Sequence, residues 1–194
     1  MPSVFFELLL AHLLGDFIFQ SNDLLQRKYK SWTGTFEHVC IIAFFTIFFL
    51  FPYWNQSFTW ITASVIFCTH FVQDVLKIGF DVRFNAKRKS VIPFFMDQLF
   101  HISLIAWLST TFATLEPLAL PEWIHKLYFS QFLALYCIGL VFFSYVVDIT
   151  QYQFYRKKTA NPREFKPDFK KMRQRILIFS IAYVLFLLVN GSFV

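Results

Sequence analysis

Residues 58–79 read FTWITASVIFCTHFVQDVLKIG. The stretch holds no proline, and its only charged side chains, Asp74 and Lys77, lie toward its C-terminal end. An apolar run of this length is long enough to cross the ~30 Å hydrocarbon core of a bilayer as an α-helix. Residues 58–79 are therefore predicted to span a membrane, and the polar residues inside the span, His70 and Asp74, need a functional or structural explanation.

The rest of the chain repeats this pattern of apolar stretches separated by short polar segments. Of the 194 residues 57% are hydrophobic, 29 are phenylalanine and only 15% are charged, which is outside the usual range of soluble globular proteins. Five further spans are predicted, at residues 3–20, 35–52, 91–113, 130–155 and 174–193. The predicted fold class is all-α: a polytopic membrane helix bundle of about six transmembrane helices in a single integral membrane domain, residues 1–194.

The first of these spans is the least regular. Four polar residues interrupt it: Glu7, His12, Asp16 and Gln20. Its start, MPSVFFELLLAHLLGD, has neither a basic region before the apolar stretch nor a small-residue cleavage site. We therefore expect a retained first span rather than a signal peptide.

Basic residues gather in alternate connections between the spans. The first two of these connections contain Arg27, Lys28, Lys30, Arg83, Lys87, Arg88 and Lys89, and the third is the basic segment 156–175. The two remaining connections hold only Lys126. The positive-inside rule then predicts that the three basic connections face the cytoplasm and that both termini face outward. The net charge of +6 is expected to attract anionic lipid headgroups rather than nucleic acid.

Histidine and aspartate recur at one spacing inside the spans. The pairs are His12 and Asp16, His70 and Asp74, and Asp97 and His101. Residues four apart share one face of a helix, so each pair can point into the bundle together. At about 1.5 Å rise per residue, the three histidines lie in one layer. His38 is expected to lie in a shallower position unless its helix begins several residues earlier, and Asp148 reaches the same layer.

Carboxylates inside a membrane require a proton, a basic partner or a metal to offset their charge. Neutral imidazoles interleaved with carboxylates suit a first-row divalent ion, zinc above manganese or iron. The predicted ligands are His12, Asp16, His70, Asp74, Asp97 and His101, with His38 as a ligand or general base. Gln20, Gln98 and Asp148 are predicted to hydrogen-bond to the ligands. The alternative is a network of hydrogen bonds between helices.

Lys77 and the cysteines carry separate expectations. Lys77 is expected to reach the cytoplasmic headgroups, to pair with Asp74 or to bind a phosphate. Cys40, Cys68 and Cys137 fall inside apolar runs without a CxxC pattern, so neither disulfides nor a thiolate zinc site is expected. The sequence also lacks the HExxH helix motif of metalloproteases.

These motifs resemble a bacterial and phage membrane family that is known only as a domain of unknown function. The resemblance rests on HLLGDFIFQ at 12–20, His38, HFVQDVLK at 70–77 and DQLFH at 97–101, within a motif core of residues 5–105. It implies a bacterial inner-membrane location and supports the polar site without naming its chemistry. A looser likeness links the site to intramembrane zinc hydrolases, at the level of ligand type alone.

The leading functional hypothesis is a membrane-embedded, metal-dependent hydrolase that acts on a lipid or lipid-linked substrate at the cytoplasmic leaflet. In this hypothesis Lys77 contacts the phosphate of an anionic headgroup. Two alternatives remain open at this point. One is a non-catalytic membrane module that binds metal or a protein partner, and the other is a proton- or ion-coupled transporter. The sequence leaves the oligomeric state undetermined.

Overall fold

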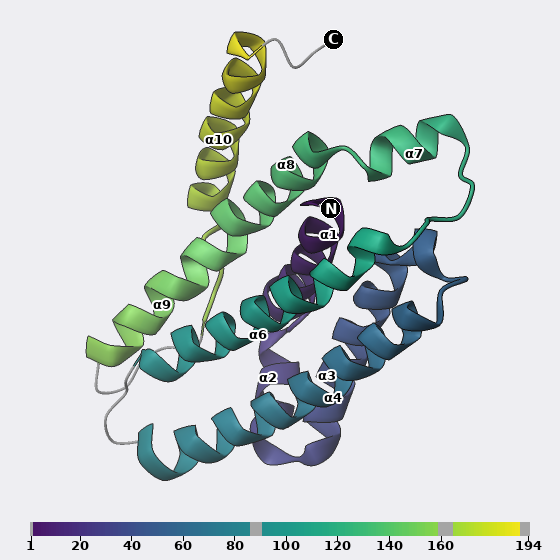
Figure 1. The fold of residues 1–194 in the computed structure, drawn as a ribbon. Coiled ribbons are helices and arrows are strands. Elements are labelled where there is room, and N and C mark those ends of the chain that lie inside the picture. The colour runs from purple at the N-terminus through teal and green to yellow at the C-terminus, as the bar shows by residue number, and fades with distance from the viewer. Residues whose placement is uncertain (1, 86–90, 159–164, 191–194) are drawn as a thin grey trace.

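The computed structural model is all-helical (Figure 1) and describes residues 2–85, 91–158 and 165–190. Five segments are long and apolar enough to cross a membrane: Trp32–Phe49, Ser57–Arg83, Ile92–Thr114, Gln131–Lys158 and Phe169–Val189. A sixth is added if the bent pair Val4–Ile18 and Asn22–Lys30 counts as one broken span. The predicted fold class of a polytopic helix bundle is confirmed.

The first span differs from its prediction because it breaks at the cytoplasmic end assigned to it. Helix α1 (Pro2–Leu13) continues into the π-helical turn η1 (Leu14–Ile18), and the chain then bends by 87° into α2 (Asn22–Lys30). Ser21 caps α2 by accepting a hydrogen bond from the Leu24 backbone at 3.1 Å. The sequence placed residues 21–34 in a loop, and the structure shows that most of them are helical.

Helix α3 (Trp32–Phe49) begins three residues before its predicted start at 35 because Ser31 accepts a hydrogen bond from the Gly34 backbone. It is followed by η2 (Phe51–Tyr53), then by α4 (Ser57–Phe80) and η3 (Asp81–Asn85). The earlier start of α3 places His38 two turns inside the helix rather than near its end. This is the physical reason why His38 reaches the depth of the other histidines.

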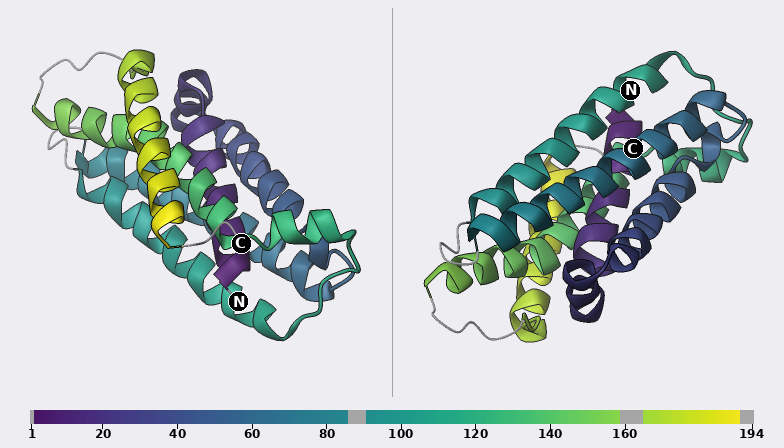
Figure 2. Two further views of the ribbon diagram at one scale, coloured as in Figure 1. Left: turned by 90° about the horizontal axis from the view of Figure 1, so that it is seen from above. Right: turned by 90° about the horizontal axis from the view of Figure 1, so that it is seen from below.

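Helices α1, α3, α4 and α6 (Ile92–Thr111, followed by η4, Phe112–Thr114) enclose an apolar core. The core contains Val4, Leu8, Ile42, Leu50, Tyr53, Ile66, Ile105, Leu108 and Phe112. All nine residues lie in the half of the bundle that contains the N-terminus and η2. Figure 2 shows α1 inside the bundle, where it packs against α3, α6 and α8.

The C-terminal part of the chain packs on the other side of α1. After α7 (Glu122–Tyr128), helix α8 (Gln131–Val141), the π-helical turn η5 (Phe142–Val146) and α9 (Val147–Lys158) form one continuous span. Leu10, Leu13, Phe17 and Val141 make a second apolar cluster between α1 and this span. Helix α10 (Phe169–Val189) lies at the edge of the molecule (Figure 1), and it begins five residues before its predicted start at 174.

The exterior of the bundle is strongly apolar. Large side chains such as Phe44, Leu76, Trp107 and Leu185 are more than half exposed. Such a surface suits lipid rather than water, so the protein is an integral membrane protein. Lys87, Arg88 and Lys89 of the predicted basic connections lie outside the described residues.

Candidate metal centre

Four helices of the bundle each contribute one histidine to a common buried centre. His12 comes from α1, His38 from α3, His70 from α4 and His101 from α6. All four side chains are at most 3% exposed. The centre adjoins the apolar core, since the core residues Leu8, Ile42, Ile66 and Ile105 line the same small void as His12, His70 and His101.

The tightest part of this centre is a triangle of three polar atoms, which we call the ligand triangle. His38 Nε2 lies 3.0 Å from Asp16 Oδ1 and 3.1 Å from His70 Nε2, and His70 Nε2 lies 3.4 Å from Asp16 Oδ1. A tetrahedral zinc ion with bonds of about 2.0–2.2 Å holds neighbouring ligand atoms roughly 3.3–3.6 Å apart. The ligand triangle therefore has nearly the size of one face of a zinc coordination tetrahedron.

Hydrogen bonding alone leaves the ligand triangle poorly satisfied. A neutral imidazole carries one proton, on either Nε2 or Nδ1. The Nε2 proton of His38 can be directed to Asp16 or to His70, but His70 Nε2 also faces the same carboxylate oxygen. At least one of the three close contacts is then left without a hydrogen bond, whereas a cation inside the triangle would bind the lone pairs of all three atoms.

Asp16 owes its position to the π-helical turn η1, and neighbouring residues hold its second oxygen. The wider turn is closed by a hydrogen bond from the Phe19 backbone to the Leu14 carbonyl, at 2.9 Å. Gln98 Nε2 donates to Asp16 Oδ2 at 3.2 Å, and Gln98 Oε1 lies 3.2 Å from His12 Nε2. Gln98 therefore joins α1 and η1 to α6 and holds the carboxylate in place. Turns of this kind are frequent at functional sites.

His101 and Asp97 lie beside the ligand triangle. The ring of His101 stacks on that of His70, with centroids 4.1 Å apart and planes 19° from parallel. His101 Nε2 is 3.3 Å from Asp97 Oδ1, and neither of these two buried atoms has a hydrogen-bond partner among the described residues. Buried polar atoms normally have partners, so both have capacity for a ligand or a water molecule.

Two lysines neutralise two of the three carboxylates of the centre. Lys28 Nζ lies 2.8 Å from Asp74 Oδ2, and both side chains are at most 5% exposed. Lys77 Nζ donates to Asp97 Oδ2 at 2.5 Å, so its carboxylate partner is Asp97 and not Asp74, which was one of three alternatives expected for it. Asp16 has no lysine or arginine partner within the described part of the chain. It is therefore the carboxylate whose charge is left to balance a cation.

Sequence reasoning missed Lys28, which it assigned to a cytoplasmic loop. The residue lies in α2, and the bend of 87° after η1 returns that helix to the mouth of the bundle. Its signal was present in the sequence: Leu24 and Lys28 are four apart and are the two buried residues of α2. A basic residue on the same helical face as a buried leucine is a candidate for burial.

Asp148 does not join the centre, contrary to its prediction. It bonds to Arg175 and accepts the backbone N–H of Asp168 at 3.1 Å. These contacts fix α9 to the start of α10. The prediction failed because depth along a helix does not determine which face a side chain occupies.

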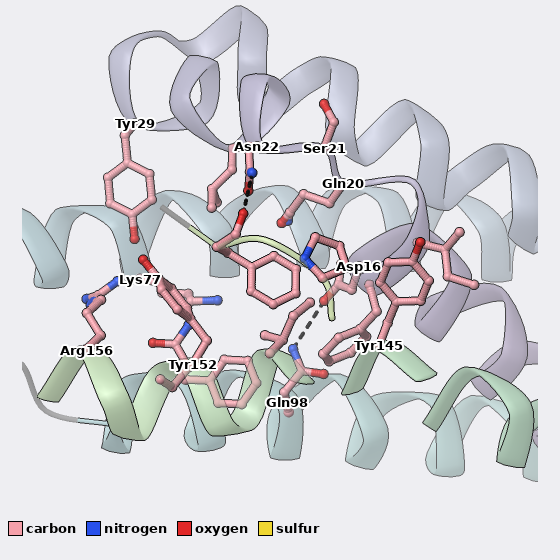
Figure 3. Close-up of a pocket in the computed structure, with 18 of the residues that line it drawn as sticks. Asp16, Gln20, Ser21, Asn22, Tyr29, Lys77, Gln98, Tyr145, Tyr152 and Arg156 are labelled. Carbon is pink, nitrogen blue, oxygen red and sulfur yellow. Dashed lines mark hydrogen bonds between the residues drawn. The ribbon is translucent and has the colours of Figure 1, made fainter. Parts of the chain in front are cut away.

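A cavity of about 320 Å³ adjoins the centre on the side away from the apolar core (Figure 3). Asp16, Gln20, Lys77 and Gln98 all line it, so Gln20 lies at the cavity rather than in the centre. Asp16 is the most exposed of the three carboxylates of the centre, with 10% of its side chain accessible against 4% for Asp74 and Asp97. The centre can therefore be reached from the cavity.

The opposite side of the centre is closed. The void that borders His12, His70 and His101 there has a volume of only about 10 Å³. Room for a single water molecule requires roughly 10–15 Å³ and polar partners. Apart from Thr46, the rest of its lining consists of apolar side chains from all four helices. The centre thus has one open side and one sealed side.

The fold and the centre define the protein as a helical membrane protein with a buried His/Asp cluster that could hold a metal ion. The chain belongs to a family described as protein of unknown function DUF3307, whose model matches residues 4–129. All the histidines and carboxylates of the centre fall within this match. Neither the comparison with curated proteins nor that with solved structures found a match.

Proposed function

We propose that the protein is a membrane-embedded, zinc-dependent hydrolase of a lipid or lipid-linked substrate, which reaches the centre from the cytoplasmic leaflet. The observation that carries this proposal is the ligand triangle of Asp16, His38 and His70 beside an open cavity. Three protein ligands with a further position free for water are typical of catalytic zinc sites. His38 then acts as a ligand rather than as a general base.

When bound, the ion would supply Lewis-acid polarisation of the substrate and activation of a water molecule. Residues of the chain supply the rest. Asp16, oriented by Gln98, provides the negative charge of the ligand set. His101, whose Nε2 has no hydrogen-bond partner among the described residues, can take the proton of the attacking water. Asp97 lies beside that nitrogen and stabilises the imidazolium that forms.

This assignment revises the ligand set predicted from the sequence. Asp74 and Asp97 were expected to bind the metal, but each is paired with a lysine. We propose that Lys28 and Asp74 position His38 and His70, since Asp74 Oδ2 lies 3.7 and 3.6 Å from their Nε2 atoms. His12 and His101 remain candidates for a second set of ligands with His70.

The sealed side of the centre favours a hydrolase over a proton- or ion-coupled transporter. Transport requires a path to both faces of the membrane. Beyond His12, His70 and His101 the void measures only about 10 Å³, and its lining is apolar except for Thr46. A hydrolase that takes its substrate from one leaflet needs access from one side only, which the cavity provides.

The first experiment measures metal in the detergent-purified protein after zinc-replete preparation and dialysis. We expect bound zinc by elemental analysis, and zinc affinity lowered ~10-fold or more in Asp16→Asn and His38→Ala, since even outer-shell changes cost 10- to 100-fold. Matched controls are Asp23→Asn and His125→Ala, two exposed residues. Absence of zinc from the unsubstituted protein, or full zinc in both centre variants, would leave a hydrogen-bond network in place of the metal centre.

The second experiment tests catalysis. The zinc-loaded protein is incubated with lipid extracted from bacterial membranes, and water-soluble and lipid products are followed by mass spectrometry. We expect products that vanish with a chelator and in the Asp16→Asn variant but persist in Asp23→Asn. Stoichiometric zinc without any such product would identify a non-catalytic metal-binding module instead.

A further inference from the structure

The cavity beside the centre has a second chemical feature, at the side farther from Asp16 in Figure 3. Arg156 and Lys77 both line it there, with Tyr29 next to them. Arg156 comes from the last turn of α9 and Lys77 from the last turn of α4. Two cations from separate helices therefore converge on a cavity whose other side touches the metal centre.

The two cations differ in the hydrogen-bond and ion-pair partners that they have among the described residues. Lys77 donates one of its three ammonium protons to Asp97, and its ammonium forms no other hydrogen bond with the residues that the structure describes. The other acidic residue of the lining, Asp81, accepts the hydroxyl proton of Tyr29 at 2.8 Å. Arg156 is half-buried and forms no ion pair with any residue that the structure describes. A partly desolvated guanidinium of this kind favours an anion that can accept two parallel hydrogen bonds.

Apolar side chains also line the cavity, among polar ones such as Gln20, Asn22 and Gln153. They come from η1, α2, α6, η5, α9 and the segment before α10, and include Phe17, Leu25, Phe94, Ile149 and Phe165. The segment before α10 is held over the cavity by Asn22, whose side chain donates to the Phe165 carbonyl at 2.7 Å. The cavity thus offers cations at one side and hydrocarbon-compatible walls elsewhere, a combination suited to an anionic group attached to an apolar body.

We infer that Arg156 and Lys77 form a subsite for the phosphate of a lipid headgroup, with the apolar walls receiving the start of its acyl chains. This inference rests on the proposed hydrolase function, because it names the class of substrate that would enter the same cavity. A phosphate carries two negative charges or one and matches the fork of a guanidinium. The cation subsite and the metal centre then hold two different parts of one substrate.

The test is a binding measurement that needs neither metal nor turnover. Metal-free, detergent-purified protein is titrated with short-chain phosphatidate, with diacylglycerol of the same chain length and with inorganic phosphate. We expect phosphatidate to bind and diacylglycerol to bind at least tenfold more weakly. Arg156→Gln should weaken phosphatidate binding tenfold or more, whereas Arg156→Lys should give an intermediate loss. Lys157→Gln, an exposed neighbour on the same helix, should bind as the unsubstituted protein does.

Two outcomes would overturn the inference. Equal phosphatidate affinity in Arg156→Gln and Lys157→Gln would remove Arg156 from the subsite. Equal affinity for inorganic phosphate and phosphatidate, both lost in Arg156→Gln, would make the ligand a free phosphate and not a lipid. Thermal unfolding of each variant shows that it is folded. Because metal is absent throughout, failure here is distinct from failure of the hydrolase proposal.

Discussion

At the scale of single residues, the centre depends on which buried charges have partners. Lys28 and Asp74 face each other at 2.8 Å with at most 5% of either side chain exposed. Each would be costly alone in a low-dielectric interior, and each makes the other tolerable. The sequence showed that Asp74 lies inside a span, but it did not show which basic residue balances it.

This pair gives a prediction about stability. Lys28→Met keeps most of the side-chain volume but leaves the Asp74 carboxylate buried and uncompensated. The free energy of unfolding should fall by about 3–5 kcal/mol, seen as a lower thermal midpoint in detergent. The double variant Lys28→Met/Asp74→Asn should recover most of the loss, because no unpaired charge remains.

A lysine in a solvent-exposed ion pair provides the control for these Lys28 and Asp74 variants. Lys126 lies 2.7 Å from Glu122, but both side chains are more than 70% exposed. Lys126→Met should change the free energy of unfolding by less than about 1 kcal/mol. If Lys28→Met were equally mild, the buried ion pair would not be a feature of the folded protein.

At the scale of elements, the turn between α2 and α3 decides whether Lys28 reaches the centre. The two helices meet so closely at Gly34 that an added Cβ would lie 2.3 Å from the Arg27 carbonyl carbon and 2.5 Å from the Lys28 nitrogen. Both are backbone atoms, so a side chain there must push α2 away as a whole. The close approach of α2 to α3 is therefore a requirement of the site as well as of the fold.

Gly34→Ala should accordingly lower both the thermal midpoint and the zinc affinity of the protein, since Asp74 loses its cation. Gly79→Ala is the matched control, because a Cβ at Gly79 meets no atom within 4 Å. Alanine also favours a helix over glycine by about 1 kcal/mol, so Gly79→Ala should be neutral or slightly stabilising. Similar zinc affinities for the two variants would show that α2 does not support the centre.

Helix periodicity correctly predicted which residues of two helices share a face. The four-residue spacing placed His70 with Asp74 and Asp97 with His101 on shared faces, and both pairs meet in the centre. Periodicity could not predict the π-helical turn at Asp16 or the bend after it. Both features depend on contacts of residues far apart in the sequence, such as the hydrogen bond from Gln98 to Asp16.

At the scale of the whole molecule, the open side of the cavity and the basic connections coincide. Arg156 lines the cavity at the end of α9, next to Lys157 and Lys158. If the positive-inside rule applies, the cavity opens toward the cytoplasmic leaflet. The orientation of the protein in its membrane therefore decides which leaflet supplies the proposed substrate.

Cysteine labelling of intact bacterial cells with a membrane-impermeant maleimide tests this orientation. In a background where Cys40, Cys68 and Cys137 are replaced by alanine, cysteines at Gln56 and Glu122 should be labelled from outside. A cysteine at Lys158 should react only after the cells are lysed. Labelling at Lys158 in intact cells would reverse the orientation and move the proposed substrate to the outer leaflet.

The sequence by itself determined that this is a helical membrane protein, because apolar stretches of sufficient length leave few other ways to satisfy the backbone in lipid. It also identified the four histidines and the three carboxylates of the centre, because polar residues inside apolar spans are rare and costly. Only the tertiary structure decided how they pair. Lys28 joined the centre, Asp148 bonded elsewhere, and Asp16 was left without a lysine or arginine partner among the described residues, because helix rotation, bends and close packing set which faces meet.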